Sequence, residues 1–233
     1  PFNGNAKDES GNGNDGTAFN IFNYEDGVSG QSIYLQKDSG PNKGGYVEFP
    51  LPIEKDSSGF TISLWIITKS IKHAGGHAFI NLGDTSDVFI GYNWYKLDFG
   101  NPEGNIQYDL GNKWTHLAYA YNDPERVLYI NGIQVSKYDK PIQISGNNAG
   151  IGKHTTVDGV PLTWISALYD EVRFYNRNLT DNEIYSLYDL NNPNPNVEQY
   201  QLVSGQGDTD NASFTIEGDQ LKAAESFDHE AKK

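Results

Sequence analysis

Two pairs of adjacent carboxylates, Glu25–Asp26 and Asp170–Glu171, are the residues whose types first suggest acid–base chemistry. Hydrolysis of a glycosidic bond needs two carboxyl groups that flank the scissile bond, one as the acid and one as the base or nucleophile. Neighbouring residues of a strand point to opposite faces of a sheet, so neither pair can converge on one bond. The sequence also has no G-x-S-x-G, H-E-x-x-H or glycine-rich phosphate-binding motif. We therefore predict that the chain is not an enzyme.

The histidines offer little support for a transition-metal site or a catalytic base. His73 and His77 lie four residues apart, but two glycines between them disfavour the helix that would align their rings. A transition-metal site also needs a third ligand in a fixed arrangement. His116 lies in an apolar segment, and we expect it to be a buried or half-buried, hydrogen-bonded histidine.

The first twenty residues are rich in glycine, asparagine and aspartate, a composition typical of a loop that folds back on itself. Such a loop can turn carbonyl and carboxylate oxygens inward, and Ca²⁺ binds roughly six to eight oxygen ligands. The spacing is not that of an EF-hand. The loop is therefore interpreted either as part of a calcium site or as a series of Asx turns without a metal.

The stretch Tyr92-Asn93-Trp94-Tyr95 has the composition of a sugar-binding surface. Aromatic faces pack against the C–H groups of a sugar ring, and a few polar groups fix its orientation. Further aromatic residues that can lie on the same concave sheet are Tyr108, Tyr119, Tyr121 and Trp164. The alternative is that these rings pack across strands in the core or at its rim.

The composition limits the classes of partner. The 233 residues include 31 Asp and Glu against 17 Lys and Arg, a formal net charge of −14, which opposes binding to nucleic acid or to an anionic membrane. Cysteine is absent, so stability cannot depend on disulfides. No apolar run is long enough to span a bilayer. The length suits one large β-sandwich, alone or with part of a second module.

Residues 162–188 contain the strongest local signals for secondary structure. From about Trp164 to Tyr175 apolar and polar residues alternate, which predicts a strand that places Tyr169, Glu171 and Arg173 on one face. Thr180 with Glu183 three residues later has the spacing of a capping box, and the following apolar residues recur at helical intervals. We predict a short helix after this strand.

Elsewhere the chain predicts about a dozen short strands separated by turn signals, the pattern of an antiparallel sandwich. Residues 60–68 form the strongest of these strands, which we expect to be central. Asn131-Gly132 predicts a type I′ hairpin. Residues 32–35 and 46–49 are expected to pair as a hairpin with a long loop. The predicted fold class is all-β, with a parallel α/β arrangement excluded because crossover helices are absent.

Four stretches, in this order along the chain, resemble the laminin-G-like, concanavalin-type jelly-roll domains of secreted bacterial proteins. They are Phe2-Asn3-Gly4-Asn5-Ala6 with the Asp/Gly/Asn loop that follows, Phe60 to Ile66, Trp114 to Ala118 with Leu128 to Gly132, and Tyr169-Asp170-Glu171-Val172-Arg173-Phe174-Tyr175 with its continuation to Thr180. The resemblance implies an antiparallel jelly-roll β-sandwich over residues 1–190.

The resemblance also implies a structural calcium ion. In relatives the opening loop often shares a calcium site with the Asp of the closing strand. This nominates Asp8, the carbonyls around Asn12 and Asn14, and Asp170 as ligands, with Asp15 as a further candidate. Glycoside hydrolases on the same sandwich commonly carry an E-x-D-x-x-E strand, which is missing from this chain.

The C-terminal part of the sequence differs in character. Residues 191–199 read as a Pro/Asn linker, because two X-Pro bonds favour extended backbone. Residues 200–233 resemble part of a cadherin-like repeat, and Asp228 and Glu230 match its acidic calcium motif. The segment is too short to bury a core of its own, so we expect it to be partial.

Together these features predict a non-catalytic carbohydrate-binding or adhesion module, with structural Ca²⁺, in an extracellular or cell-surface bacterial protein. We expect a monomeric module of a larger chain whose partner is a glycan or polysaccharide, with no nucleic-acid partner and no membrane insertion. Two alternatives stay open: a structural spacer of an adhesin, and an accessory domain of a polysaccharide-degrading enzyme.

Overall fold

The computed structural model describes residues 1–20, 22–37, 44–71, 77–83, 89–93, 96–98, 106–155, 161–162, 165–193, 213–217 and 220–223. The chain divides into two compact units, Pro1–Pro193 and Asn194–Lys233, each of which is described by itself. The boundary between them lies inside the stretch that the sequence assigns to a linker.

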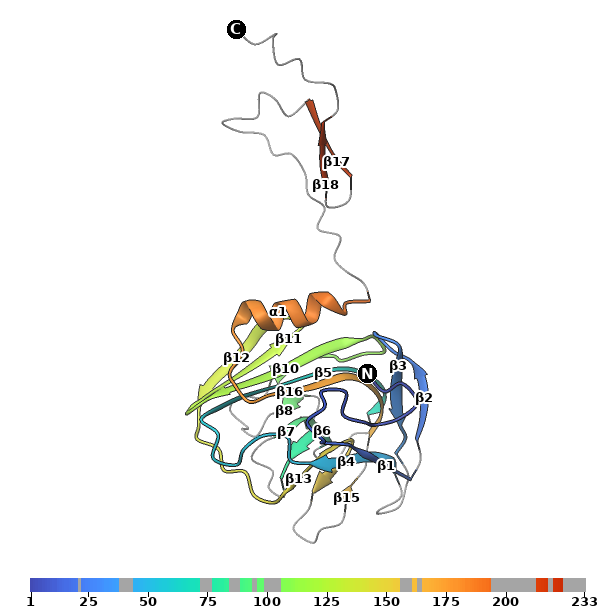
Figure 1. Cartoon of the computed structure of the whole chain (residues 1–233), viewed down its shortest axis with the longest axis vertical. Helices are drawn as coiled ribbons and strands as arrows, with labels where there is room; N and C mark the ends of the chain where they lie inside the picture. The colour runs from blue at the N-terminus through green and yellow to red at the C-terminus, as the bar shows by residue number, and fades with distance from the viewer. Residues whose placement is uncertain are drawn as a thin grey trace. The chain divides into compact units, whose positions relative to one another are not determined.

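In the described part of the first unit, two seven-stranded antiparallel sheets pack face to face (Figure 1). The first sheet contains, in spatial order, β1 (Thr17–Phe19), β4 (Tyr46–Pro50), β13 (Asn148–Ile151), β6 (His77–Leu82), β7 (Phe89–Asn93), β8 (Lys96–Asp98) and β9 (Ile106–Gln107). The second contains β12 (Ile133–Asp139), β11 (Glu125–Ile130), β10 (Thr115–Asn122), β5 (Gly59–Ile71), β16 (Ile165–Tyr175), β3 (Gln31–Leu35) and β2 (Phe22–Asp26). A small hairpin pairs β14 (His154–Thr155) with β15 (Pro161–Leu162). The predicted all-β antiparallel sandwich is confirmed.

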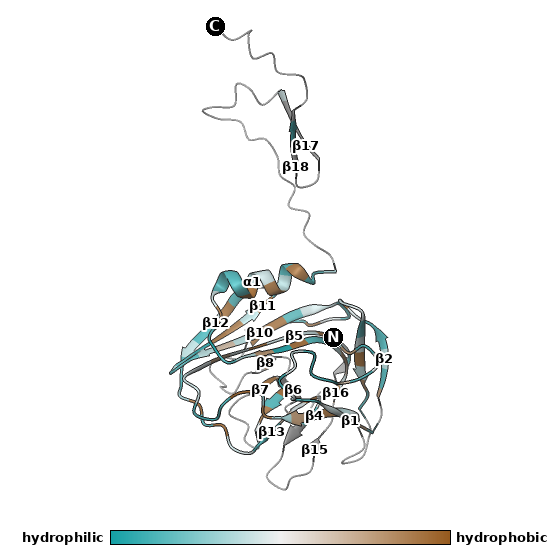
Figure 2. Cartoon of the chain, in the orientation of Figure 1, coloured by the Kyte–Doolittle hydropathy of each residue, from teal (hydrophilic) through white to brown (hydrophobic). Residues whose placement is uncertain are grey.

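The inner faces of the two sheets form the main core. Strand β5 lies between β10 and β16, as expected of a central strand, and its Ile62, Leu64 and Ile66 are fully buried. Figure 2 shows brown, apolar segments along the strands of both layers. The predicted hairpin at Asn131-Gly132 is also confirmed, since both residues have positive φ and join β11 to β12.

One predicted pairing is wrong. Strands β3 and β4 were expected to form a hairpin, but β3 pairs with β2 and β16 in one sheet, whereas β4 pairs with β1 and β13 in the other. The connection between them therefore crosses from one layer to the other. Alternation along each strand indicates which face is buried but carries no information about which strand is its neighbour.

The alternation predicted for β16 holds only as far as Tyr169. Between Asp170 and Arg173 the register against β5 shifts at a β-bulge, where Glu171 has a φ of 47°. A bulge inserts an extra residue and so reverses the inside–outside phase that follows it. As a result Val172 and Phe174, rather than Arg173, continue the core face that Tyr169 occupies.

The predicted helix is α1 (Asp181–Leu190), and its capping box is formed as expected. The Thr180 side chain accepts a hydrogen bond from the backbone of Glu183, whose carboxylate accepts one from the Thr180 N–H at 2.9 Å. The helix lies over the outer face of the second sheet, where Ile184 is fully buried (Figure 1). Among the described residues, no helix combines the length and apolar character needed to cross a bilayer.

In the second unit, β17 (Phe214–Glu217) and β18 (Gln220–Ala223) form an antiparallel hairpin. Asp228 and Glu230, the acidic pair that resembles a cadherin calcium motif, lie outside the described residues. The cadherin-like interpretation of this unit stays a prediction.

Candidate functional site

The opening loop is held together by the carboxylate of Asp8. Asp8 Oδ1 accepts hydrogen bonds from the Ser10 N–H at 2.9 Å and from the Ser10 hydroxyl, and Oδ2 accepts one from the Asn14 N–H at 3.0 Å. The Asp8 N–H in turn donates to Asp15 Oδ1 at 2.9 Å. Because these donors, Ser10 first, favour the ionised form, the pKa of Asp8 lies below its usual value. The loop is therefore an Asx-turn structure that presents negative charge.

The base of this loop is fixed to the start of β3. The Phe2 N–H donates to the Gln31 carbonyl at 2.9 Å, and Asn3 Oδ1 accepts a hydrogen bond from the Gln31 N–H at 3.0 Å. Phe2 is buried, and the Gly16 N–H closes the loop on the Ala6 carbonyl at 2.8 Å. In Figure 1 this N-terminal segment crosses the edge of the sandwich in front of β16 and β4.

The bulge of β16 sends two adjacent carboxylates to different partners. Asp170 is fully buried and accepts hydrogen bonds from the backbone N–H groups of Ser29, at 3.0 Å, and of Glu171, at 2.8 Å. Burial raises the pKa of Asp170, an effect that these two hydrogen bonds oppose. Glu171 is 4% exposed and forms an ion pair with Arg173. Asp170 therefore fixes the turn between β2 and β3, while Glu171 faces the opening loop.

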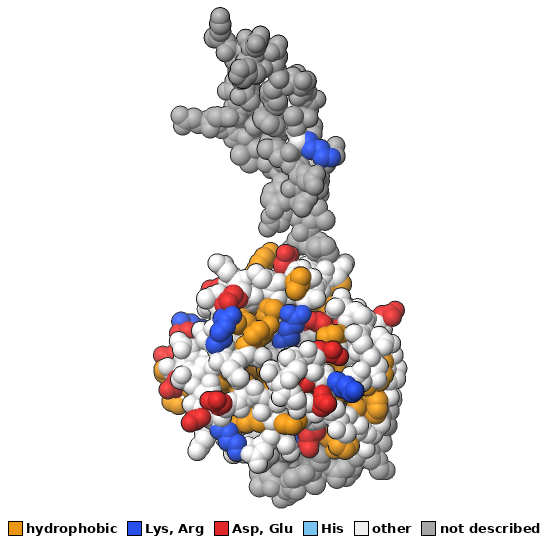
Figure 3. All heavy atoms as spheres, in the orientation of Figure 1, with side chains coloured by type: hydrophobic (Ala, Val, Ile, Leu, Met, Phe, Trp, Pro, Cys, Tyr) orange, Lys and Arg blue, Asp and Glu red, His pale blue; other side chains and the backbone are white. Residues whose placement is uncertain are grey.

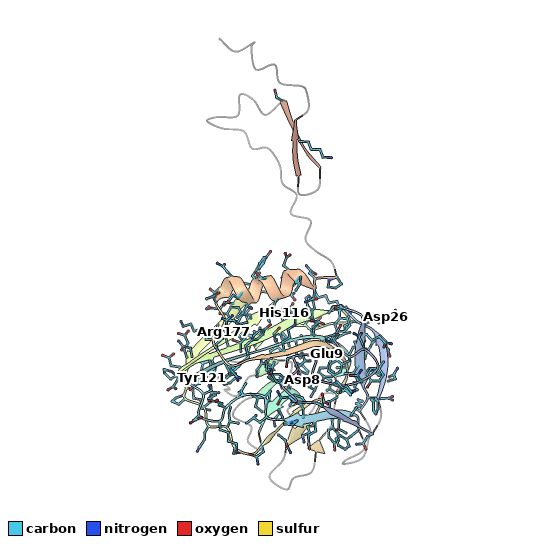
Figure 4. The ribbon with its side chains drawn as sticks, viewed as in Figure 1. Asp8, Glu9, Asp26, His116, Tyr121 and Arg177 are labelled. Carbon is cyan, nitrogen blue, oxygen red and sulfur yellow. The ribbon has the colours of Figure 1, made fainter. Side chains whose placement is uncertain are left out.

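Between this loop and β16 lies a cleft of about 480 Å³. Its apolar wall comes from both sheets and from the start of the chain: Phe2, Val47, Phe49, Ile151, Val172 and Phe174. Its polar groups come from the loop and from the end of β16: Asp8, Asn12, Asn14, Glu171, Arg173 and Asn176. Figure 4 shows Asp8 and Glu9 side by side in front of the sandwich, and Figure 3 shows charged and apolar side chains interspersed on this face. An apolar wall with a few polar groups is the usual composition of a small-molecule site.

The five predicted calcium ligands do not share one location. Asp8, Asn12 and Asn14 line the cleft, and Asp15 binds the backbone of Asp8. Asp170 is directed to the Ser29 turn and does not line the cleft. Across the described residues, no three carboxylate or histidine side chains gather as they would around a metal ion. Carbonyl oxygens of the loop can supply further ligands, so calcium stays a prediction.

The predicted sugar-binding stretch is only partly described. Tyr92 and Asn93 lie at the end of β7, where their backbones pair with Leu97 and Lys96 of β8. Trp94 and Tyr95 lie outside the described residues. Of the other aromatic residues, Tyr119 and Tyr121 are buried in the core, Tyr108 is partly buried against it, and Trp164 lies outside the described residues. For Tyr119 and Tyr121 the packing interpretation is therefore correct and the sugar-binding one is wrong.

His116 is the buried, hydrogen-bonded histidine that the sequence predicts. Its Nε2 lies 2.8 Å from Ser63 Oγ, and its ring packs 5.3 Å from that of Trp65. Its side chain is fully buried and so cannot reach a substrate, and Figure 4 shows it beneath α1. His73 lies outside the described residues, and His77 begins β6.

Several cleft residues were not recognised from the sequence. Arg173 and Phe174 were assigned to the wrong faces because the bulge does not appear in the alternation. Phe2 and Phe49 meet Phe174 only after folding, and no local pattern relates them. The Asp/Asn/Gly composition of the opening loop was the one available signal.

Residues 41–185 match the family model of the concanavalin A-like lectin/glucanases superfamily. A search among curated proteins found no match.

Solved structures that this fold matches include toxin binding domains and a domain of an arabinanase. The binding domain of botulinum neurotoxin DC in complex with rat synaptotagmin II has a TM-score of 0.62 and 17% identity, over 79% of this chain and 48% of the toxin chain. The same toxin domain in complex with SialylT gives 0.60 and 16%, over the same shares. Domain 4 of AbnA, a GH43 extracellular arabinanase from Geobacillus stearothermophilus, in complex with arabinotriose, gives 0.61 and 18%, over 80% of this chain and 94% of that domain. The chain spans about half of the toxin binding domains, and at these identities the similarity is one of fold.

Proposed function

The chain belongs to the concanavalin A-like lectin/glucanases superfamily, and we propose that it is a non-catalytic carbohydrate-binding or adhesion module of an extracellular bacterial protein. The observation that carries the proposal is the cleft beside β16, where phenylalanine side chains adjoin amide, carboxylate and guanidinium groups. Sugar rings need this combination, because their C–H faces are apolar and their hydroxyls need both donors and acceptors. The volume of about 480 Å³ suits one or two sugar units.

The related structures support a glycan as the class of ligand. One neighbour is an arabinanase domain in complex with arabinotriose, and another is a toxin binding domain in complex with SialylT. The arabinanase domain is matched over 94% of its length, which favours an accessory domain of a polysaccharide-degrading enzyme as the second candidate function. An extracellular location is part of the proposal, and it is supported by the same neighbour, which is a domain of an extracellular arabinanase.

The proposal that the module is non-catalytic rests on the chemistry of Asp170 and Glu171. The carboxylate of Asp170 is fully buried behind the Ser29 turn, so it cannot contact a sugar. Glu171 is 4% exposed, and its carboxylate is paired with the Arg173 guanidinium and with the N-terminal ammonium group of Pro1, so it is already engaged by two cations. A pair of cooperating carboxylates is therefore unavailable at this bulge.

Calcium is proposed as a structural ion of the opening loop. Asp8 and Asp15 supply carboxylates, and Asn12 and Asn14 supply amide oxygens within the same short segment. Asp8 is only partly buried, so an ion can reach it, whereas Asp170 is fully buried. The role of the ion would be to hold the loop against the cleft and not to take part in a reaction.

Glycan binding is tested by calorimetric titration of the purified chain with a panel of oligosaccharides that includes arabinotriose. Asn176→Ala removes an exposed polar group of the cleft and should weaken binding. Asn182→Ala, at an equally exposed position on α1, serves as the matched control and should leave affinity unchanged. Trp94→Ala tests the stretch predicted from the sequence. Loss of binding in Trp94→Ala but not in Asn176→Ala would place the site at the β7–β8 connection and not in the cleft. If the wild-type chain binds none of the oligosaccharides, the structural spacer is the remaining alternative.

A further inference from the structure

The outer face of the first sheet carries an exposed aromatic surface that is separate from the cleft. Strands β1, β4 and β13 lie side by side, with Phe19 opposite Tyr46 and with Thr17 and Gly150 on either side of Glu48. Along β4, Val47 and Phe49 are buried toward the cleft and the core, so Tyr46 and Glu48 point to the opposite face. We call Phe19, Tyr46, Glu48 and Lys153 the outer platform.

The rings of the outer platform are ordered by stacking. Phe19 and Tyr46 lie nearly parallel, at 16°, with their centroids 4.8 Å apart. Phe19 is 36% exposed although it is a large apolar residue. Stacking on a regular sheet holds the two rings in place before a ligand binds, which lowers the entropic cost of binding a flat apolar ligand surface.

A charged pair lies beside these rings in a fixed position. The Lys153 ammonium group forms an ion pair with Glu48 and lies 5.4 Å from the centre of the Tyr46 ring. Its methylene chain crosses Gly150, where a Cβ atom would lie only 3.0–3.1 Å from Lys153 carbons. The absence of a side chain at Gly150 therefore lets Lys153 lie flat across the sheet.

From this arrangement we propose that the outer platform is a second saccharide-binding subsite, which takes a neutral sugar ring. The C–H face of the ring would pack on Phe19, and its hydroxyls would donate to the Glu48 carboxylate and accept from Lys153. The Glu48 side chain is 34% exposed and that of Lys153 is 11% exposed, so the accessible charge is negative. Together with the formal net charge of −14 this disfavours uronic acids and other acidic sugars. The inference rests on the proposed glycan-binding function and adds to it.

Two subsites on opposite faces of β4 would act together on a polymer. A long polysaccharide, or two chains of one aggregate, can contact the cleft and the outer platform at once. Once the first subsite is occupied, binding to the second is intramolecular, so the overall affinity exceeds that of either subsite alone. A trisaccharide that occupies one subsite lacks this gain. The subsite should therefore matter more for polymers than for short oligosaccharides.

The test compares retention of the full chain by neutral and acidic polysaccharides in affinity electrophoresis. Phe19→Ala should weaken binding to a neutral polysaccharide by about tenfold or more, and Phe19→Trp, which keeps a ring, should retain it. The matched control is Phe22→Ala, because Phe22 is 39% exposed but lies on β2 of the other sheet. Thermal unfolding of each variant establishes that it is folded.

The possible results separate this inference from the function on which it rests. If the wild-type chain binds and Asn176→Ala weakens that binding while Phe19→Ala does not, the subsite is refuted and the proposed function stands. If Phe22→Ala weakens binding as much as Phe19→Ala does, or if acidic polysaccharides are retained as strongly as neutral ones, the assigned position or ligand class is wrong. If the wild-type chain binds no saccharide, the proposed function fails and the subsite fails with it.

Discussion

His116 should make the first unit lose stability between pH 7 and pH 5. The ring is fully buried against Trp65, and Nδ1 has no hydrogen-bond partner among the described residues. Burial, and to a lesser extent the charge of Arg173, lowers the pKa of His116 to about 3. The unfolded chain binds a proton near pH 6.5, so below that pH the unfolded state holds more protons than the folded state.

The sign and size of the effect follow from this difference. A base with a depressed pKa in the folded state stabilises the fold least at low pH, so the free energy of unfolding falls as the pH drops through 6.5 toward 3. Between pH 7 and pH 5 the expected loss from His116 alone is about 2 kcal/mol. The Asp170 carboxyl acts in the opposite direction, because burial raises its pKa and its stabilising contribution is lost as the pH rises.

Urea unfolding at pH 7 and pH 5 measures this loss directly. In His116→Gln, whose amide can replace the contact with Ser63 Oγ, the difference between the two pH values should shrink by about 2 kcal/mol, whatever the stability of the variant at pH 7. His229→Gln, in the second unit, controls for the replacement of a histidine by glutamine outside the first unit. An unchanged pH difference in His116→Gln would refute the conclusion that His116 is buried and neutral in the folded chain.

Three further changes test other parts of the structure. Thr180→Ala removes the capping hydrogen bond from the Glu183 N–H and should lower the free energy of unfolding by about 1 kcal/mol. A change below about 0.3 kcal/mol would mean that the cap does not contribute to stability. Gly27→Ala places a Cβ atom 2.2 Å from Asp170 Oδ2 and should lower the free energy of unfolding, measured with urea, by about 1–3 kcal/mol. An unchanged free energy of unfolding would argue against close packing of Asp170 on the turn between β2 and β3. Calcium added to a chelator-treated sample at about 100 times its Kd should raise the free energy of unfolding by about 2.7 kcal/mol. Asp8→Asn should reduce this gain. A melting temperature that does not change when calcium is added to the wild-type chain would exclude a structural calcium ion.

The sequence predicts those features that depend on neighbouring residues. The capping box at Thr180, the hairpin at Asn131-Gly132 and the central strand from Phe60 each carry a local signal of spacing or alternation, and the structure contains all three. Burial of His116 was also predicted, because its segment is apolar. Local physical chemistry is therefore sufficient for the fold class and for most element positions.

The features that were missed depend on long-range pairing or on one unusual backbone angle. The bulge at Glu171 leaves no mark on the pattern of residue types, so the faces of Arg173 and Phe174 were reversed. The expected pairing of β3 with β4 failed because the connection passes between layers. The cleft itself joins residues near positions 2, 49 and 174, and only the folded chain brings them together.

Isothermal titration of the wild-type chain with a panel of neutral oligosaccharides decides whether the chain binds carbohydrate, as proposed. We predict saturable heat with at least one member of the panel, weakened in Asn176→Ala and unchanged in Asn182→Ala. No detectable heat with any saccharide, from a chain shown to be folded by its cooperative thermal transition, would contradict the claim.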